Sequence, residues 1–413
     1  LRRQRQMCIR DSVYATITLD FGTEKSLFDK GTVLDLTSYL LLRGSDKYTL
    51  QQVADKSIEA GGAATATSAD NGMTINIQAR KDKFEDFFKF VVEVMKHPSF
   101  EQTQFDLIKS QSLASLDRPY TEPETVAALN LARLIEIYQP GDLRYHFEPE
   151  FAKKQLNQAT QAQVKQLYNQ FFAMNHAQIA ITGDFDAKKM QQFIAQSFGS
   201  WSSSQPYQKI LSTDTDYPAQ KVHALSEQRE FGNYQSILTF PVGVDHLDAP
   251  ALIVFTNILG QSQLSSRLGQ ELREKNALVY GFGSDLQLDS DTNVGALTIE
   301  ANYTAGRGEQ VSQTVHHVLQ KLLQNGVTEQ ELESAKADIL KKRVTTLEDE
   351  RSIHRMLNSQ LERGKNMLDR GQRDRDIAKL SKADIDAVIK KYIKLDHFVE
   401  VMADQYGQTV KKP

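Results

Sequence analysis

Residues 265–282 read SSRLGQELREKNALVYGF, and this stretch says most about the fold. Its charged first part is typical of the end of a helix, and its last part, rich in Val, Tyr and Phe, is typical of a strand. The pattern predicts a helix, a short turn and then a strand. Arg273 and Tyr280 are seven residues apart, one on each side of the predicted turn.

Two similar units follow each other along the chain. The expected elements recur in the same order: strands at 16–22 and 236–243, helices at 34–42 and 249–259, strands at 75–79 and 299–303, helices at 84–95 and 311–322, and strands at 179–184 and 399–404. The recurrence of several elements in one order indicates an internal duplication.

The strands and helices of each unit have the periodicity of elements that are buried on one face. Ile75, Ile77 and Ala79 alternate with polar residues, as in a strand with one face in the core. Residues 84–95 place their apolar side chains at helical spacing. We therefore predict the α+β class, with two tandem homologous domains, each a sheet with helices packed mainly on one face.

At 413 residues the chain is long enough for two domains. We predict domains at 13–200 and 222–413, joined by a linker at 201–221 that is rich in Ser and polar residues and contains Pro206 and Pro218. Residues 1–12 are rich in Arg and have no apolar core. We interpret them as a non-native leader, such as a translated sequencing adapter, with a basic tail as the alternative.

Composition narrows the possible partners. The net charge of -4 gives no reason to expect nucleic acid or an anionic membrane as a partner. No apolar run approaches the roughly 20 residues that span a bilayer. Cys8 is the single cysteine, which excludes an internal disulfide and a cysteine cluster for metal. The compartment stays open between a reducing cytoplasm and a bacterial periplasm.

An apolar helix at 249–259 is followed in order by Ser-Ser-Arg-Leu, Glu-Leu-Arg-Glu-Lys and Leu-Val-Tyr. This order resembles the second-domain segment of the insulinase/pitrilysin family of zinc metallopeptidases, and the resemblance extends over nearly the whole chain from Val13. It implies that Arg273 and Tyr280 contact the substrate and stabilise the scissile carbonyl oxygen as it becomes an oxyanion. Spacing alone is equally compatible with a surface arginine and an ordinary strand aromatic.

The zinc motif of that family is absent. Members carry H-x-x-E-H on a helix, with two His ligands and a Glu base. Residues 31–45 resemble the family's segment, but the motif positions of the ligands and the base are Asp35, Ser38 and Tyr39. The third ligand is expected near 111–116, which reads QSLASL and contains no carboxylate. We therefore predict no metal in this chain.

Two other groupings of histidines do not predict a metal site. His316 and His317 are adjacent, so they point to different faces of a helix. His146 lies near Glu148 and Glu150 in a charged loop, which is more often only solvated. The charged stretch 348–375 is interpreted as a solvated pair of helices with stabilising i, i+4 pairs, in preference to a partner-binding surface.

The resemblance implies a clamshell in which this chain is the non-catalytic half. It would close over peptides, held by strand addition to a sheet edge, and supply the Arg and Tyr contacts. Zn²⁺ and the Glu base would come from an H-x-x-E-H partner half, in the same longer chain or in a separate subunit. The chain alone is predicted to be inactive. The alternative is a catalytically silent structural or assembly subunit, resembling core proteins of respiratory complexes.

Overall fold

The computed structural model describes residues 12–69, 71–118, 120–213, 215–227 and 230–409. The leader predicted at 1–12 lies outside the described residues except for Ser12, which begins the first strand. None of the described helices combines the length and the apolar character that a bilayer-crossing helix needs.

The chain forms two compact units whose segments alternate along the sequence. The first unit contains the residues up to Arg118, Tyr138–Ile210 and Thr345–Asn366, and the second contains Pro119–Ile137, Leu211–Val344 and the residues from Met367 onward. Each unit thus includes one short segment from the opposite half of the sequence. The domain boundaries predicted above divide the chain into contiguous parts and remain a prediction; the compact units cross them at these two segments.

The first unit is built on a four-stranded antiparallel sheet in the order β2-β3-β1-β4. The strands are β1 (Ser12–Asp20), β2 (Ala63–Ala69), β3 (Gly72–Arg80) and β4 (Ala177–Thr182). Ile17 on β1 is paired with Ile75 on β3 and with Ile179 on β4. The alternation predicted at 75–79 is confirmed, because Ile75, Ile77 and Ala79 are buried in the core of this unit.

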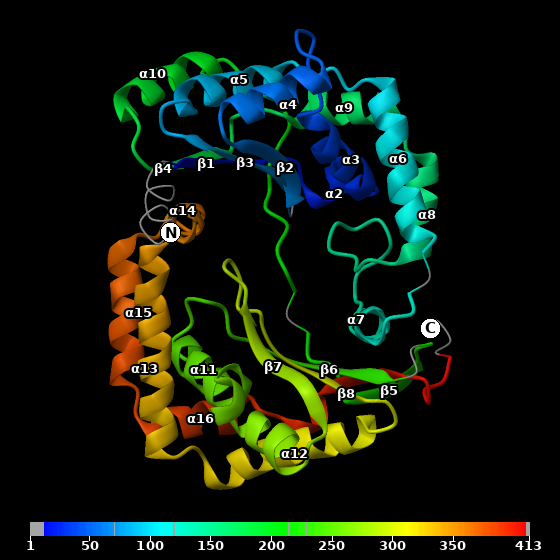
Figure 1. Ribbon diagram of the computed structural model, residues 1–413, viewed down its shortest axis with the longest axis vertical. Coiled ribbons are helices and arrows are strands. Elements are labelled where there is room, and N and C mark those ends of the chain that lie inside the picture. The colour runs from blue at the N-terminus through cyan, green and yellow to red at the C-terminus, as the bar shows by residue number, and fades with distance from the viewer. Residues whose placement is uncertain (1–11, 70, 119, 214, 228–229, 410–413) are drawn as a thin grey trace. The chain divides into compact units, whose positions relative to one another are not determined.

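Helices cover one face of this sheet. They are α2 (Glu24–Leu27), α3 (Gly31–Leu41), α4 (Leu50–Glu59), α5 (Phe84–Lys96), α6 (Gln102–Leu116), α8 (Pro149–Gln158), α9 (Gln161–Phe171) and α10 (Ala187–Phe198). The predicted apolar stripe of α5 is buried along its length. Figure 1 shows α5 and α10 on one side of the sheet and α14 (Glu350–Glu362) on the other.

The helix α14 reaches the first sheet from the second half of the sequence and packs on β1 and β4. His354 of α14 is only 5% exposed. Its Nε2 lies 2.8 Å from the hydroxyl of Thr16, and its Nδ1 lies 3.0 Å from the hydroxyl of Thr182. Because Thr16 donates its hydrogen to Asn76, it accepts from Nε2–H, and Nδ1 accepts from Thr182.

The interpretation of 348–375 as a solvated pair of helices is therefore right for only one of the two. The second helix, α15 (Met367–Lys379), has a single buried residue, Ile377. By contrast, α14 buries His354 and Gln360. The sequence did not distinguish the two helices, because the buried residues of α14 are polar.

The second unit is built on a five-stranded sheet in the order β5-β9-β6-β8-β7. The strands are β5 (Gln220–Leu225), β6 (Phe231–Phe240), β7 (Val279–Leu288), β8 (Gly295–Thr304) and β9 (Val399–Asp404). The pairing of β5 with β9 is parallel and the other pairings are antiparallel. With two sheets carrying helices on their faces, the predicted α+β class is confirmed.

The core face of the second sheet is covered by helices from the same half of the sequence. The elements are α11 (Ala249–Thr256), η1 (Asn257–Gln261), η2 (Gln263–Ser265), η3 (Gly269–Lys275), α12 (Gly308–Asn325), α13 (Glu329–Thr345), α16 (Lys382–Tyr392) and η5 (Leu395–His397). The short η4 (Thr346–Glu348) belongs to the first unit. The helix stop predicted at Gly326 is confirmed, with φ at 67°. The capping box predicted for Thr328 and Glu331 is also present.

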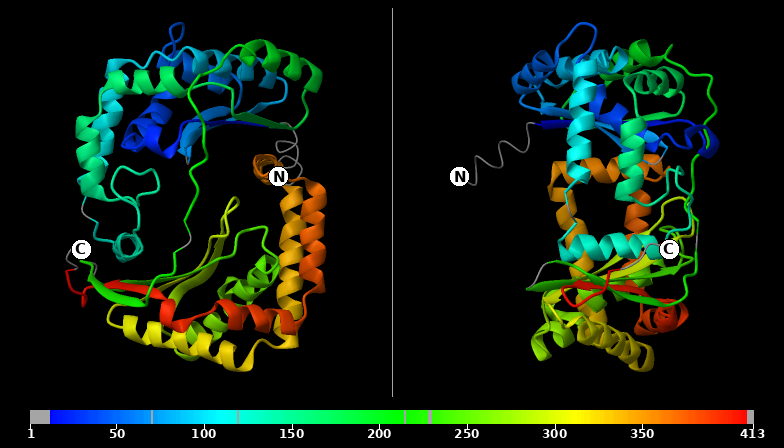
Figure 2. Two further views of the ribbon diagram at one scale, coloured as in Figure 1. Left: turned by 180° about the vertical axis from the view of Figure 1, so that it is seen from behind. Right: turned by 90° about the vertical axis from the view of Figure 1, so that its right-hand side faces the viewer.

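The opposite face of this sheet is partly covered by α7 (Pro123–Leu134), which comes from the first half of the sequence. Val126, Ala127 and Leu131 of α7 pack in one cluster with apolar residues of β5 and β9. The views in Figure 2 agree with Figure 1 that α7 lies against the second sheet and α14 against the first. The two halves of the chain have thus exchanged one helix each.

We predict that the buried His354 makes the first unit less stable in acid. Burial lowers the pKa of His354 below its ordinary value, so the unfolded chain takes up the proton first as the pH falls. The stabilisation is complete above the unfolded pKa of about 6.5 and is lost as the pH falls towards the folded pKa. The urea midpoint should therefore fall more between pH 7.5 and 5.5 in the parent chain than in His354→Gln.

The exposed His317 provides the matched control. His317→Gln should keep the pH dependence of the parent chain. An equal pH dependence in His354→Gln would contradict this assignment.

Candidate functional site

The structure places Arg273 and Tyr280 on the helix, turn and strand that the sequence predicts. Arg273 lies in η3, a π-helical segment, and Tyr280 is the second residue of β7. In the turn, Ala277 has φ at 46°, and the amide of Leu278 donates to the carbonyl of Leu272 at 2.8 Å. The turn therefore places Arg273 and Tyr280 on consecutive elements of the second unit, η3 and β7.

Arg273 is an exposed side chain. Within the described residues no side-chain hydrogen bond or ion pair engages its guanidinium, although Glu271 of the same segment binds Lys275 and Lys321. The wide π-helical turn is a form that occurs frequently at functional sites. Arg273 is thus a permanent positive charge whose five donors are available to a ligand.

Tyr280 occupies a β-bulge in an end strand of the sheet. Val279 is paired with Tyr303 and Gly281 with Asn302, so Tyr280 is the extra residue between them. Its side chain is 47% exposed and meets the edge of the Phe231 ring at a centroid distance of 5.3 Å. Bulges are frequent next to active sites, because they re-aim a side chain.

The hydroxyl of Tyr280 already has a partner. It donates to the carbonyl oxygen of Tyr303 at 2.7 Å, and partial burial raises its pKa above the ordinary value. A phenol has a single hydrogen to donate, so in this arrangement Tyr280 can only accept from a ligand. No hydrogen bond joins Tyr280 to Arg273 among the described residues.

The Ser-Ser-Arg-Leu sequence has a structural explanation. Arg267 forms an ion pair with both carboxylate oxygens of Glu331, one of them at 2.8 Å, and Glu331 also caps the start of α13 through Thr328. Leu268 is fully buried, and Ser266 accepts from the amide of Gly269. Arg267 therefore fastens the loop before η3 to α13.

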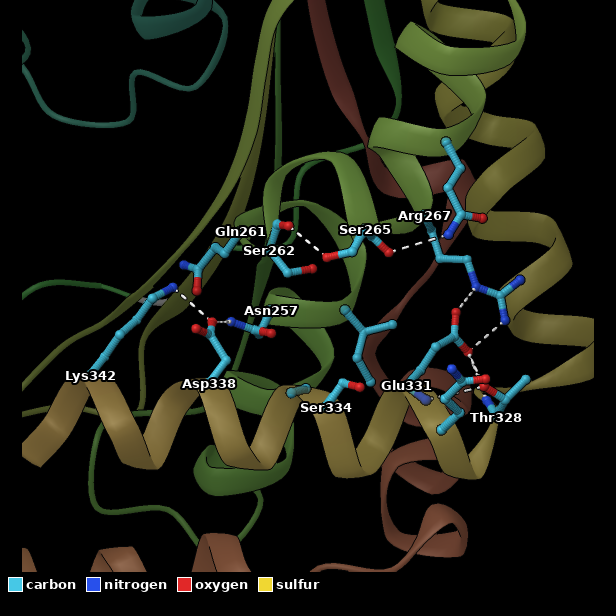
Figure 3. Close-up of a pocket in the computed structure, with 14 residues that line it drawn as sticks. Asn257, Gln261, Ser262, Ser265, Arg267, Thr328, Glu331, Ser334, Asp338 and Lys342 are labelled. Atoms are coloured by element: carbon cyan, nitrogen blue, oxygen red, sulfur yellow. Dashed lines mark hydrogen bonds and ion pairs between the residues drawn. The ribbon is translucent and has the colours of Figure 1, made fainter.

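A polar pocket of about 710 Å³ lies between this loop and α13. Figure 3 shows Arg267 facing Glu331 at one end, while Asp338 lies between Asn257 and Lys342 at the other. At each end of the pocket the polar side chains bind neighbours in the same end, so these groups already have partners within the chain.

The positions that the resemblance assigns to the zinc motif lie on α3 of the first unit. Asp35 accepts a hydrogen bond from Ser68, and its burial raises its pKa above the ordinary range. Ser38 is 3% exposed and donates to the carbonyl of Asp35 at 2.7 Å. Tyr39 is 53% exposed.

These residues line a pocket of about 380 Å³ together with the segment where the third ligand is expected. Asp35 and Tyr39 face this pocket from α3, and Ser112 and Ser115 face it from α6. Zinc in proteins is held by His nitrogen, Cys sulfur and carboxylate oxygen, usually four ligands in all. Asp142, His146 and Glu148 also line this pocket, but the described residues contain no group of three or more His, Cys, Asp and Glu residues placed to hold an ion. The residues at the predicted motif positions therefore do not fit zinc.

No metal centre is found in the described ranges. They contain no group of three or more His, Cys, Asp and Glu residues placed to hold an ion, and this includes His146 with Glu148 and Glu150. The adjacent histidines His316 and His317 have different surroundings. His316 binds Glu400 at 2.8 Å, whereas His317 is exposed.

One part of the second unit has no counterpart in the sequence predictions. A pocket of about 310 Å³ opens on the face of β7 and β8 that α7 leaves uncovered. Glu124, Asp285 and Glu300 line it, and they come from three separate elements. The signal in the sequence is faint: glycine at alternate positions, Gly281 and Gly283, directly after Tyr280.

The chain resembles zinc metallopeptidases in fold and in sequence. Residues 158–339 match the family model described as the peptidase M16 inactive domain. Over 190 residues the chain is 27% identical to YmxG, an uncharacterised zinc protease of Bacillus subtilis, and the match covers 46% of this chain and 44% of that protein. The chain thus spans less than half the length of this curated relative.

Solved structures share the fold. A peptidase M16 inactive domain from Pseudomonas fluorescens superposes with a TM-score of 0.81 at 21% identity, covering 98% of this chain and 95% of that one. The periplasmic protease PqqL from Escherichia coli gives 0.74 at 15% identity, covering 95% of this chain but 43% of that one. The predicted resemblance to the M16 peptidases, the insulinase/pitrilysin family, is confirmed, and the matched segment is of the inactive type.

We predict that the ion pair between Arg267 and Glu331 stabilises the second unit. Both side chains are mostly buried, at 24% and 21% exposure, so Arg267→Met leaves a shielded carboxylate without its cation. The free energy of unfolding should fall by about 1–3 kcal/mol. Arg267→Lys should cost less, because lysine keeps the charge but not the two parallel bonds.

Urea denaturation measures this difference. Lys275→Met removes a more exposed pair with Glu271 and should cost less than about 1 kcal/mol. Equal losses in Arg267→Met and Lys275→Met would contradict the role given to Arg267.

Proposed function

We propose that this chain is the non-catalytic half of an M16-type zinc endopeptidase, which closes over a peptide and supplies Arg273 and Tyr280 to the scissile carbonyl. A partner half would hold Zn²⁺, the Glu base and the attacking water. One observation carries the proposal: the guanidinium of Arg273 has no side-chain partner among the described residues, and the element after the next turn carries a half-exposed tyrosine at the bulge of an end strand.

The chemistry of the two side chains suits an oxyanion. The guanidinium of Arg273 stays charged at any physiological pH and can donate to an oxygen that gains negative charge. Each fixed donor of this kind is typically worth about 10²–10³ in rate. Arg273 can act in this way without breaking a side-chain hydrogen bond or ion pair among the described residues.

Tyr280 must first exchange its partner. Its hydroxyl hydrogen points to the carbonyl of Tyr303, so donation to a substrate requires rotation about the bond between the ring and the oxygen. That rotation leaves the ring in place. We propose that the bound carbonyl oxygen, as it becomes negative, competes successfully with the neutral carbonyl of Tyr303, because hydrogen bonds to charged acceptors are stronger.

The position of β7 supports a peptide ligand. It is the last strand in the order of its sheet, and an extended peptide can add to such an edge through main-chain hydrogen bonds. A peptide bound in this way would run past Tyr280. We therefore propose extended peptide segments as the substrates.

The hydrogen bond between Tyr280 and Tyr303 favours a second candidate function. It fastens the bulge to the neighbouring strand, which is a purely structural task. In a catalytically silent structural subunit Tyr280 would have that task alone. The two functions predict different results for the same substitution.

We predict that Tyr280→Phe lowers kcat/KM for peptide hydrolysis by the assembled enzyme well over tenfold without preventing assembly. The reason is the loss of one oxyanion donor while the ring keeps its packing on Phe231. Steady-state kinetics and size-exclusion chromatography measure the two quantities. Tyr406→Phe, at a tyrosine that is 63% exposed in the same unit, is the matched control.

A kcat/KM of Tyr280→Phe close to that of the parent enzyme would contradict the catalytic role of Tyr280. If stability fell at the same time, the structural subunit would be favoured.

We further predict that Arg273→Gln lowers kcat/KM but leaves the free energy of unfolding within about 0.5 kcal/mol, because Arg273 has no side-chain partner among the described residues. Kinetics of the assembled enzyme and urea denaturation of the chain check the two parts. The exposed Arg375, replaced by Gln, is the control and should change neither. Unchanged kinetics in Arg273→Gln would contradict the proposed contact.

A further inference from the structure

The helix α14 is fastened to the first sheet by a stripe of polar side chains. Its hydrogen bonds to the sheet join Arg351 to Gln78 at 2.6 Å, His354 to Thr16 and Thr182 at 2.8 and 3.0 Å, and Glu362 to Thr18 at 3.1 Å. Arg351, His354 and Glu362 recur at helical spacing, so they lie on one side of α14. The strands meet this side of the helix with hydroxyls and an amide.

The apolar residues of α14 do not enter the core of the unit. None of them is buried, and none belongs to the apolar clusters of the described residues: Ile353, Met356, Leu357 and Leu361. A helix that covers a sheet ordinarily turns an apolar stripe towards it, as α5 does on the other face of this sheet. Hydrogen bonds are exchanged for bonds to water when a helix is released, so they resist release less than apolar burial does.

Two buried amide oxygens at this contact have no hydrogen-bond partner among the described residues. Gln178 of β4 is paired with Thr18, so it shares the face that α14 covers, and its Oε1 has no partner. Asn358 lies one turn after His354 on α14, and its Nδ2 donates to Glu362 at 2.8 Å while its Oδ1 has no partner. Such acceptors cost free energy while they are shielded from water. Release of α14 returns both to water.

The end of α14 provides a hinge. Gly364 has φ at 62°, and a Cβ added there would meet nothing within 4 Å, so the backbone rotation and not space requires glycine. Hinges are a few residues at the end of an element that absorb changes in φ and ψ. The next helix, α15, begins at Met367 and belongs to the second unit. Rotation at Gly364 therefore lets α14 move without breaking α15.

His354 is the group in this contact whose charge changes near neutral pH. From the sheet, β1 brings the ring of Tyr14, stacked at a centroid distance of 5.9 Å, and Asp20 at its far end, while β4 brings no ionisable residue. The charged residues of η4, of the cap and of α14 itself are Glu348, Asp349, Glu350, Arg351, Arg355 and Glu362. Among the described residues no ion pair engages His354, and burial lowers its pKa.

We propose that α14 is a releasable cover of the first sheet and that protonation of His354 releases it. On the docked helix Nε2–H donates to Thr16 and Nδ1 accepts from Thr182, which suits the neutral ring. A second proton removes the acceptor and leaves a buried charge without a carboxylate among the described residues. The released ring takes up the proton at its ordinary pKa of about 6.5. Docking is therefore strongest above this pH and weakens as the pH falls below it.

Release changes both the sheet and the helix. It uncovers the hydroxyls of Thr16, Thr18 and Thr182 on β1 and β4, and it removes the segment Thr345–Asn366 from the first unit. A helix of 13 residues is marginal in water without tertiary contacts. The backbone amides of released α14 therefore lose their protection from exchange with solvent.

Hydrogen exchange of the full chain, followed by mass spectrometry at pH 7.5 and 5.5, tests the proposal. After correction for intrinsic exchange rates, the amides of α14 should be protected at least tenfold less than those of α5 at both pH values. Low concentrations of urea should hardly change the protection of α14, because its release exposes little surface, but should lower that of α5. Equal protection and equal urea dependence of α14 and α5 would overturn the proposal.

The effect of pH is tested with His354→Gln, whose amide can make both hydrogen bonds but does not titrate. Between pH 7.5 and 5.5 the protection of α14 should fall by up to about tenfold in the parent chain, the limit for a released histidine of ordinary pKa. In His354→Gln this fall should disappear. The same fall in both chains would contradict the role of His354.

Two variants on the exposed side chains of α14 test the polar attachment without touching a buried residue. Arg351→Met removes the bond to Gln78 and should speed exchange of the α14 amides about fivefold at both pH values. Arg355→Met is the matched control, because Arg355 bonds only to Ser352 of its own helix among the described residues, and it should change little. Equal exchange in the two variants would count against the proposal.

Discussion

Each sheet of this protein has two faces to bury, and the rest of the structure depends on how the second face is covered. Helices from the same half of the sequence cover one face of each sheet. The other face receives a helix from the opposite half: α14 on the first sheet and α7 on the second. Because each unit contains a piece of the other half of the chain, neither half of the sequence contains all the side chains that its sheet needs.

The two exchanged helices cover their sheets by different means. Three apolar residues of α7 enter an apolar cluster with β5 and β9. By contrast, α14 presents a buried histidine whose two ring nitrogens meet the hydroxyls of Thr16 and Thr182. A buried polar group of this kind is stable only when all its hydrogen bonds are made. The apolar cover leaves the β7 end of its sheet open, and the candidate peptide site lies there.

The positions that the resemblance assigns to the zinc motif lie on a helix whose other face is buried in the core. Val33, Leu34, Leu36, Leu40 and Leu41 of α3 are buried in the core, while Asp35 and Tyr39 face a pocket. The core face of this helix and its pocket face are separate stripes, so changes on one need not affect the other. This separation explains how an M16 fold persists here with a donor set that does not suit zinc.

The sequence by itself determined the type and order of the elements that recur in the two halves of the chain. Alternation at 75–79, the apolar stripe at 84–95 and the repeat of the element order depend on local periodicity, which residues close in the chain encode. The helix, turn and strand that carry Arg273 and Tyr280 could be predicted for the same reason. The assignment of Asp35, Ser38 and Tyr39 to the motif positions depends on flanking residues that resemble the family's segment, and it remains a prediction.

Only the tertiary structure decided which segments cover which sheet. The exchange of α7 and α14 depends on contacts such as that of Thr16 with His354, which are 338 residues apart and leave no periodic signal. The hydrogen bond of Tyr280 to Tyr303 follows from strand register and a bulge. The pocket of Glu124, Asp285 and Glu300 likewise exists because pairing and packing bring three distant carboxylates together, which no local pattern encodes.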